Sequence, residues 1–104
     1  MSDFSIVTTS VDSQEAADAI IASVLDEKLA ACVQVFPIQS HYVWQGERRS
    51  DAEIFLQMKI KTSDWDAVRA AIADIHPYET PQILRVAIEA GHAPYLKWIA
   101  DVTQ

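Results

Sequence analysis

The sequence contains very little glycine and cysteine: two glycines, Gly46 and Gly91, and one cysteine, Cys32. A phosphate-binding loop needs several closely spaced glycines to bring its backbone N–H groups against the ligand, so two isolated glycines exclude such a loop. One cysteine excludes a disulfide within these 104 residues and the paired cysteines of a structural zinc site, and it fits a reducing compartment. Free cysteine is usually buried, so we expect Cys32 to pack in the core.

Positive charge is also scarce. Eight lysines and arginines stand against fifteen acidic residues, which gives a formal net charge of -7. Such a chain repels nucleic-acid phosphates and anionic lipid headgroups, so neither nucleic acid nor a membrane is an expected partner. The sequence also lacks an apolar run near the ~20 residues of a membrane span and a basic region at its start. We therefore expect a soluble, cytoplasmic protein.

Apolar sequence is plentiful, because half of the residues are hydrophobic. That content is enough to build a core, and 104 residues match the size of one ordinary domain. We therefore expect a single domain over residues 1–104.

Hydrophobic periodicity predicts an alternation of strands and helices. The β-branched residues over 4–9 favour a buried strand, and a strict period of two over 53–61 favours a strand with one core-facing side. Asp12, with Glu15 as its reciprocal partner, and Ser63 are expected to cap the first two helices. The expected elements are, in chain order, a strand over 4–9, a helix over 13–28, strands over 31–45 and 53–61, a helix over 63–76, a strand over 82–88 and a last helix from Pro94.

This order predicts an α+β fold, a ferredoxin-like two-layer sandwich of the βαββαβ type with a C-terminal helix. Gly46 lies among polar residues and signals a turn over 45–50, which joins the second and third strands into a long hairpin. Arms of about 14 residues would span about 45 Å. Pro37 favours an edge position or a bulge in the first arm, because proline cannot donate to the strand ladder.

A two-layer sandwich leaves one face of its sheet uncovered, and Phe55 is expected on that face. The outer half of the hairpin, with Tyr42, Val43 and Trp44, is expected to overhang the body and to contact another copy of the chain. In the alternative, the last helix folds back over these residues. The residues of that helix expected to face inward are Tyr95, Trp98, Ile99 and Val102.

Three motifs resemble the divalent-cation-tolerance (CutA) family: Ala-Ala-Cys-Val at 30–33, Ser-His-Tyr-Val-Trp-Gln-Gly at 40–46, and His-Pro-Tyr-Glu-Thr-Pro at 76–81. Further similarity at 59–62 and 95–98 extends the resemblance over about residues 4 to 103. The resemblance implies a cytoplasmic homotrimer of ferredoxin-like subunits, and an association with tolerance to divalent metals, copper above all. The resemblance does not imply an established enzymatic activity. The sequence also lacks the residue spacings of a nucleophile elbow or a metalloprotease, so no motif supports catalysis.

His76 and Glu79 are the candidate metal ligands. His76 resembles the histidine that the family places before Pro-Tyr, and Glu79 adds an oxygen ligand three residues later. In the alternative, His76 merely ends a helix or is hydrogen-bonded in the core. Some relatives carry a cysteine and a second histidine where this chain has Thr8 and Ile75, so any copper binding is expected to be weaker or assembled across subunits.

Tyr42, Trp44, Lys61 and Tyr78 are expected to form a ligand cleft between subunits, because aromatic walls with a few fixed charges suit a small ligand, an anion or a metal. In the alternative, Lys61 and Glu79 are ion-pair partners at an interface that the aromatic residues anchor. A second alternative is a trimeric signalling module like the nitrogen-regulatory PII proteins. Such modules extend a flexible loop, whereas the turn expected here is short.

Overall fold

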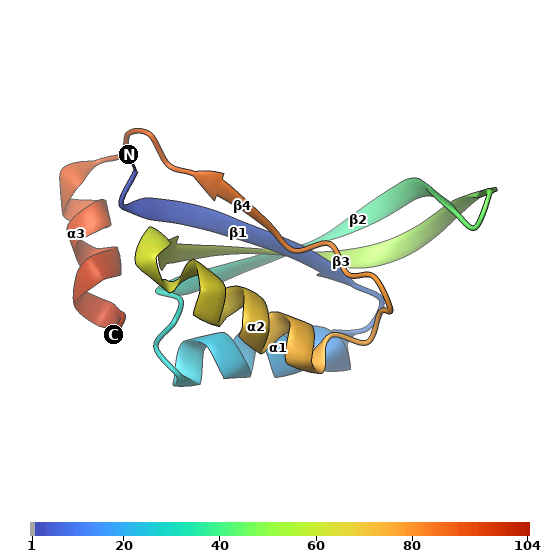
Figure 1. The fold of residues 1–104 in the computed structure, drawn as a ribbon, viewed down its shortest axis with the longest axis horizontal. Helices are drawn as coiled ribbons and strands as arrows, with labels where there is room; N and C mark the ends of the chain where they lie inside the picture. Colours follow the sequence, from blue (N-terminus) through green and yellow to red (C-terminus); the bar gives the residue numbers. More distant parts are fainter. Residues whose placement is uncertain (1) are drawn as a thin grey trace.

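The computed structural model describes residues 2–104, and Figure 1 shows the strands and helices that they form. The elements are, in chain order, β1 (Phe4–Val11), α1 (Gln14–Asp26), β2 (Cys32–Trp44), β3 (Glu47–Lys61), the short 3-10 helix η1 (Thr62–Asp64), α2 (Trp65–Ile75), β4 (Leu84–Ala87) and α3 (Ala93–Val102). This order of strands and α-helices is the predicted one.

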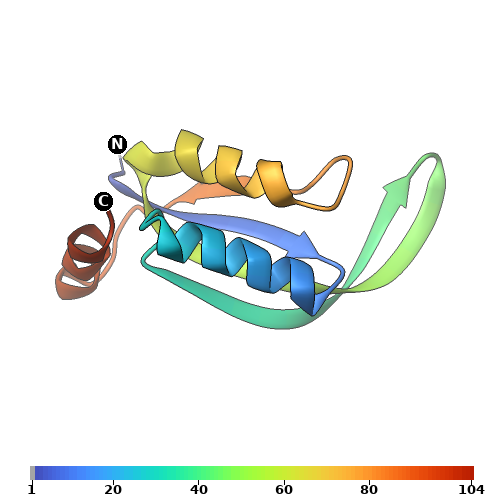
Figure 2. The ribbon, with the colours of Figure 1, turned by 90° about the horizontal axis from the view of Figure 1, so that it is seen from below.

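The four strands form one antiparallel sheet in the order β2-β3-β1-β4. β1 lies in the middle, where Phe4 pairs with Lys61 of β3 and Ser5 pairs with Ala87 of β4. Figure 2 shows α1 and α2 side by side on one face of this sheet. The predicted α+β fold class is confirmed, with a four-stranded antiparallel sheet and helices.

The core lies between this sheet face and the two helices. Its strand residues alternate along β3, where Leu56, Met58 and Ile60 are fully buried, as the period of two predicts. Helical spacing supplies the opposite wall, with Ile20 of α1 and Ile72 of α2 also fully buried. Burying one such side chain stabilises the fold by about 1.5–3 kcal/mol. Burial of these apolar side chains therefore holds the two layers together.

Both predicted helix caps are displaced by one residue. Ser13, and not Asp12, caps α1: its backbone is extended and its hydroxyl oxygen accepts a 3.1 Å hydrogen bond from the Ala16 N–H. Ser63 lies inside η1, so its backbone is not free to take the extended cap conformation, and Asp64 occupies the cap position of α2 without a side-chain hydrogen bond. The end of α2 is as predicted, because the residue before Pro77 is extended.

The β2–β3 hairpin has the expected length, with arms of 13 and 15 residues, but its turn is tighter than the sequence indicates. Its ladder runs without interruption from Cys32, paired with Lys59, to Trp44, paired with Glu47. The turn is therefore only Gln45 and Gly46, both at positive φ (51° and 76°), which is a type I′ geometry. The turn predicted over 45–50 is wrong, because Glu47 to Ser50 stay in the ladder. The whole molecule, hairpin and body together, extends 44 Å along its longest axis.

Pro37 lies in β2, which forms one edge of the sheet. The edge position predicted for it is confirmed. The bulge that was the alternative is absent from the described β2–β3 ladder, because the pairing register is constant through the partner of Pro37, Ile54.

The sheet face opposite α1 and α2, here called the open face, carries Phe36 and Phe55, whose ring centroids lie 5.1 Å apart. It also carries Leu84 and Val86 of β4, which are 55% and 54% exposed. The open face thus presents apolar side chains to solvent in a single chain, as expected for Phe55.

Helix α3 lies at the end of the molecule opposite the hairpin turn (Figure 1), so the alternative in which it covers Tyr42, Val43 and Trp44 is wrong. Of the α3 residues expected to face inward, only Ile99 is buried. Tyr95, Trp98 and Val102 are each about 40% exposed, because α3 contacts the body over a small area at one end of β3.

Cys32 is half-buried on the open face and does not pack in the core. Its pairing partner Lys59 shares that face, which α1 and α2 do not cover. Its sulfur lies 3.6 Å from the hydroxyl oxygen of Tyr95. Burial of Cys32 is therefore partial, because α1 and α2 cover the other face of the sheet and Tyr95 of α3 contacts Cys32 from the end of the molecule.

Candidate functional site

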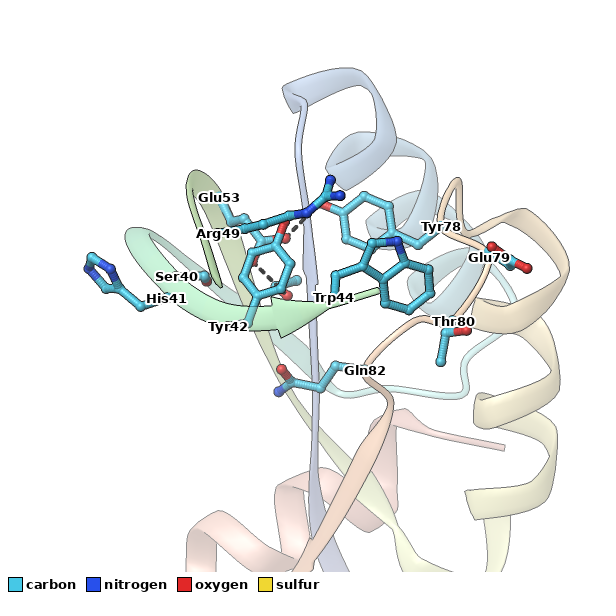
Figure 3. A pocket seen from close by; sticks show the side chains of 11 residues that line it. Ser40, His41, Tyr42, Trp44, Arg49, Glu53, Tyr78, Glu79, Thr80 and Gln82 are labelled. Atoms are coloured by element: carbon cyan, nitrogen blue, oxygen red, sulfur yellow. Dashed lines mark hydrogen bonds between the residues drawn. The ribbon is translucent and has the colours of Figure 1, made fainter. Parts of the chain in front are cut away.

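A pocket of about 600 Å³ lies between the outer half of the hairpin and the loop that follows α2 (Figure 3). We call residues 40–51 the hairpin overhang. Tyr42 and Trp44 of the overhang and Tyr78 of the loop line the pocket, together with Glu79. Three of the four residues predicted for a ligand cleft thus meet within one chain.

Lys61, the fourth, lies elsewhere. It lines a second hollow, of about 410 Å³, with residues 2–4, Thr62 and Ser63. Lys61 ends β3, twelve residues beyond Arg49 of the overhang, and twelve residues of strand span about 40 Å. One chain therefore does not bring Lys61 to the aromatic pocket, so only a Lys61 from another copy remains as a candidate there.

Strand pairing places the pocket residues of the overhang on one face. Tyr42 pairs directly with Arg49, and Trp44 with Glu47. Because side chains two positions apart share a face, Tyr42, Trp44, Arg49 and Glu53 belong to the same side of the hairpin. Figure 3 shows the His41 imidazole pointing away from this group, as expected because His41 is adjacent to Tyr42 in β2 and neighbouring side chains of a strand lie on opposite faces.

Several pocket residues were missed by the sequence analysis. Those on the hairpin are Ser40, His41, Arg49 and Glu53, and those elsewhere are Ser10, Thr80 and Gln82. The signal for Arg49 was the period of two that places Glu53 and Phe55 on the open face. Because residues 45–50 were expected to form a turn, the alternation was not continued back to Arg49, and Arg49 was not predicted as a pocket residue.

Tyr78 and Glu53 connect the two walls of the pocket. The Tyr78 hydroxyl donates a 2.6 Å hydrogen bond to Glu53 Oε2, and the Ser10 hydroxyl donates a 3.5 Å bond to Oε1 of the same carboxylate. Burial, followed by the hydrogen bond to Glu53 and its negative charge, raises the pKa of Tyr78 far above its usual value. Tyr78 therefore remains a neutral donor at any physiological pH.

A second tyrosine and carboxylate pair lies farther out on the overhang. The Tyr42 hydroxyl donates a hydrogen bond to Asp51, and this bond is the main reason that the pKa of Tyr42 is raised. Arg49 stands beside them without an ion pair to Asp51. Its closest carboxylate contact among the described residues is a 3.8 Å approach to Glu47 Oε2, and the Glu47 side chain is 75% exposed.

Both ring nitrogens of His76 are engaged by the protein. Nδ1 accepts a 3.2 Å hydrogen bond from the Tyr78 backbone N–H, and Nε2 lies 3.0 Å from the Ser10 carbonyl oxygen. An acceptor at Nδ1 and a carbonyl opposite Nε2 require the neutral tautomer with its proton on Nε2. Burial lowers the pKa of His76, against the opposing effects of the Ser10 carbonyl, Glu53 and Asp12. His76 therefore positions Tyr78.

A preformed metal centre does not fit this arrangement. Within residues 2–104 no group of three or more His, Cys, Asp or Glu side chains is placed to hold a metal ion. The ring nitrogens of His76 are occupied, and Glu79 is an exposed residue of the loop, shown at its outer side in Figure 3. Thr8 and Ile75 supply no ligand in place of a thiolate or imidazole. A metal would need ligands from more than one copy of the chain.

Comparison with known proteins identifies the family. The family model described as CutA1 divalent ion tolerance protein matches residues 5–102. The chain belongs to this family. The resemblance drawn from the motifs at 30–33, 40–46 and 76–81 is thus confirmed.

Relatives of similar length align along almost the whole chain. The divalent-cation tolerance protein CutA of Thermus thermophilus is 35% identical over 99 residues, which cover 94% of this chain and 96% of that protein. The structure of the periplasmic divalent cation tolerance protein CutA from Archaeoglobus fulgidus superposes with a TM-score of 0.94 at 32% identity, covering 97% of this chain and 99% of that one. These similarities extend the family relationship to the complete fold.

Other relatives are longer. The CutA homolog of Xenopus laevis is 39% identical over 84 residues, and the chain spans 56% of its length. A rice relative described as chloroplastic is likewise matched over 56% of its length. Family members are thus described as periplasmic or chloroplastic, and the cytoplasmic location stays a prediction. Within residues 2–104, no helix has the length and apolar character needed to cross a membrane.

Proposed function

We propose that this chain is a CutA-type divalent-cation-tolerance protein that self-associates, as a homotrimer, and binds a small ligand or a divalent cation where its hairpin overhang meets a neighbouring copy. The proposal rests above all on the aromatic pocket of about 600 Å³ formed by a hairpin that overhangs its own body. Small-ligand sites are concave, of this size, and lined by aromatic residues with few polar groups. The protein acts in this proposal by binding and not by catalysis.

Self-association is supported by the apolar residues that one chain leaves in water. Phe36, Leu84 and Val86 of the open face are 44%, 55% and 54% exposed, and Val43 of the overhang is 71% exposed. Exposed apolar side chains gathered on one face mark an interaction surface. Identical copies are the partner proposed here, because the overhang extends beyond its own body, where it would reach a neighbouring copy, and most soluble oligomers are symmetric assemblies of identical chains.

A divalent cation is the ligand that the family's description suggests, and copper is the one that the motif resemblance implies. In this chain the cation would have to draw on residues such as His76 and Glu79 from more than one copy, since a single chain offers no group of three ligands among residues 2–104. His76 would also have to break a hydrogen bond to Ser10 or Tyr78. These costs favour a small organic ligand over a metal held in one subunit.

The PII-like alternative is less well supported. A signalling loop would have to emerge between the second and third strands, where the ladder continues to Trp44 and Glu47 and the turn has two residues. Such a turn leaves no flexible segment for contact with a partner protein.

Sedimentation and copper titration test the proposal together. The wild-type protein is expected to sediment as a trimer at micromolar concentration, and Val86→Asp is expected to shift it toward monomers, because a charge at this exposed position opposes burial by a neighbour. Addition of Cu²⁺, monitored by calorimetry, is expected to show weaker binding in His76→Ala than in wild type. The control is His92→Ala, which changes an exposed histidine at the start of α3.

A wild-type protein that remains a compact monomer would contradict the self-association and the shared cleft. Equal copper binding by wild type and His76→Ala would remove His76 from any metal site while leaving the aromatic pocket as the ligand site.

A further inference from the structure

Two opposite charges on one wall of the aromatic pocket are not paired with each other. Arg49 and Glu53 lie four residues apart on β3, with their side chains on the same face. Their Cα atoms are about 13 Å apart along the strand. Both line the pocket, yet no carboxylate oxygen of Glu53 lies within 4 Å of the Arg49 guanidinium. Arg49 and Glu53 therefore do not neutralise each other, and each can meet a complementary group of a ligand.

Of the described residues that line the pocket, Arg49 is the only lysine or arginine. Its side chain is 41% exposed, and its contact with Glu47 is long and lies in solvent, where such a pair contributes little. A guanidinium offers a planar fork of N–H donors that matches a carboxylate in two parallel hydrogen bonds. Arg49 is thus suited to bind the carboxylate of a ligand.

The carboxylate of Glu53 is held in place by the Tyr78 and Ser10 hydroxyls, which donate to its two oxygens. These hydroxyls orient the carboxylate without cancelling its charge, and each oxygen keeps a further lone pair. An ammonium group is the complement of such a fixed anion. Tyr42, Trp44 and Tyr78 add aromatic rings to the same pocket, and aromatic faces attract cations as well as flat apolar groups.

An anion without an amine would be repelled by Glu53, and an amine without a carboxylate would be repelled by Arg49. A molecule that carries both charges satisfies both groups. Figure 3 shows Arg49 and Glu53 on the side of the hairpin that bears Tyr42 and Trp44, across from the loop with Tyr78.

We propose that the aromatic pocket binds a small zwitterion of the amino-acid class, whose carboxylate pairs with Arg49, whose ammonium pairs with Glu53, and whose apolar part lies against Tyr42, Trp44 and Tyr78. This inference rests on the proposed function, because it names the ligand of the same pocket. It assigns to Arg49 and Glu53 a role in specificity that the motifs of the family resemblance do not include.

Three probes that share a phenyl ring on a short alkyl chain test the proposal on the full-length protein. Phenylalanine carries both charges, 3-phenylpropionate lacks the amine, and 2-phenylethylamine lacks the carboxylate. Their binding is measured by calorimetry and by the fluorescence of Trp44, read in a Trp65→Phe/Trp98→Phe background. Phenylalanine is expected to bind at least about tenfold more tightly than either of the others, since it forms two charge-assisted contacts where they form one.

Variants separate the two charges. Arg49→Gln is expected to weaken phenylalanine at least about tenfold and to leave 2-phenylethylamine as tight or tighter. Glu53→Gln keeps an acceptor for the Tyr78 hydroxyl and is expected to weaken phenylalanine and 2-phenylethylamine but not 3-phenylpropionate. Arg48→Gln is the matched control, because Arg48 is the adjacent arginine on the opposite face and does not line the pocket.

Equal affinity for the three probes, or no effect of Arg49→Gln, would overturn the zwitterion assignment. If no probe binds while the trimer persists and Cu²⁺ still changes Trp44 fluorescence, the ligand class is wrong and the proposed function stands. If the protein is also monomeric and Trp44 responds to nothing, both the ligand class and the proposed function are wrong.

Discussion

The Tyr78 hydroxyl donates a 2.6 Å hydrogen bond to Glu53 Oε2, which joins the loop after α2 to the long hairpin. The bond therefore ties the two walls of the pocket to each other. The acceptor of this hydrogen bond is charged and Tyr78 is half-buried. We therefore expect the bond to contribute more to the free energy of unfolding than a hydrogen bond in solvent does, and less than one in the core does.

Tyr78→Phe is expected to lower the free energy of unfolding by about 1 kcal/mol, since it removes this bond and leaves Glu53 with one fewer donor. Urea denaturation at fixed protein concentration measures the change. Tyr42→Phe is the matched control: it removes a hydrogen bond from an exposed pair and is expected to change stability by less than about 0.5 kcal/mol. Equal losses in the two variants would show that Tyr78 does not hold the pocket together.

His76 is expected to make stability depend on pH. Because burial lowers its pKa below the ordinary value of 6.5, the unfolded chain binds a proton more readily than the folded one. Stability is therefore fully present above about pH 6.5 and falls as the pH decreases from there toward the folded pKa. Protonation of Nδ1 would also break the hydrogen bond from the Tyr78 N–H.

Urea denaturation of wild type and His76→Gln at about pH 7.5 and about pH 5.5, which bracket the unfolded pKa, checks this dependence. The wild-type protein is expected to lose more stability over this interval than the variant, which cannot titrate at position 76. The same loss in both proteins would assign the pH dependence to other groups.

Ile72→Ala is expected to lower the free energy of unfolding by about 2–5 kcal/mol, because Ile72 is fully buried between α2 and the sheet and its truncation leaves a cavity. Ile75→Ala is the control. It changes the same residue type on the same helix, but Ile75 is 40% exposed, so the expected loss is below about 1 kcal/mol. Thermal or urea denaturation gives both values, and a reversed order would place the core elsewhere.

Gly46→Ala is expected to loosen the tip of the hairpin. Gly46 has a φ of +76°, where a Cβ costs about 1 kcal/mol, and nothing lies within 4 Å of the added atom, so the cost comes from the backbone alone. Gln45→Asn is expected to act in the opposite direction, because asparagine tolerates the positive φ of position 45 better than glutamine does.

Amide hydrogen exchange over residues 42–49 measures this effect, with faster exchange expected for Gly46→Ala and slower exchange for Gln45→Asn. The amides of β1 are the internal control, since they lie in the middle of the sheet. Unchanged exchange in Gly46→Ala would mean that contacts with another copy, and not the turn, hold the overhang.

Elements with a strong local signal could be predicted from the sequence. The alternation of apolar residues over 53–61 predicted a strand whose core side holds Leu56, Met58 and Ile60, and Pro77 predicted where α2 ends. Features that depend on where neighbouring elements stop could not be predicted as well. The residue that caps α1 is Ser13 and not the predicted Asp12, because β1 extends to Val11 and the helix begins later than expected.

The sequence alone determined the family motifs, the order of strands and helices and the aromatic character of the candidate site, because these depend on residue type and local spacing. Only the tertiary structure decided that Arg49 and Glu53 face Tyr78 while Lys61 lies at the far end of β3. The physical reason is the pairing register: a two-residue turn at Gln45 and Gly46 places every later residue of β3, and a local pattern does not contain that register.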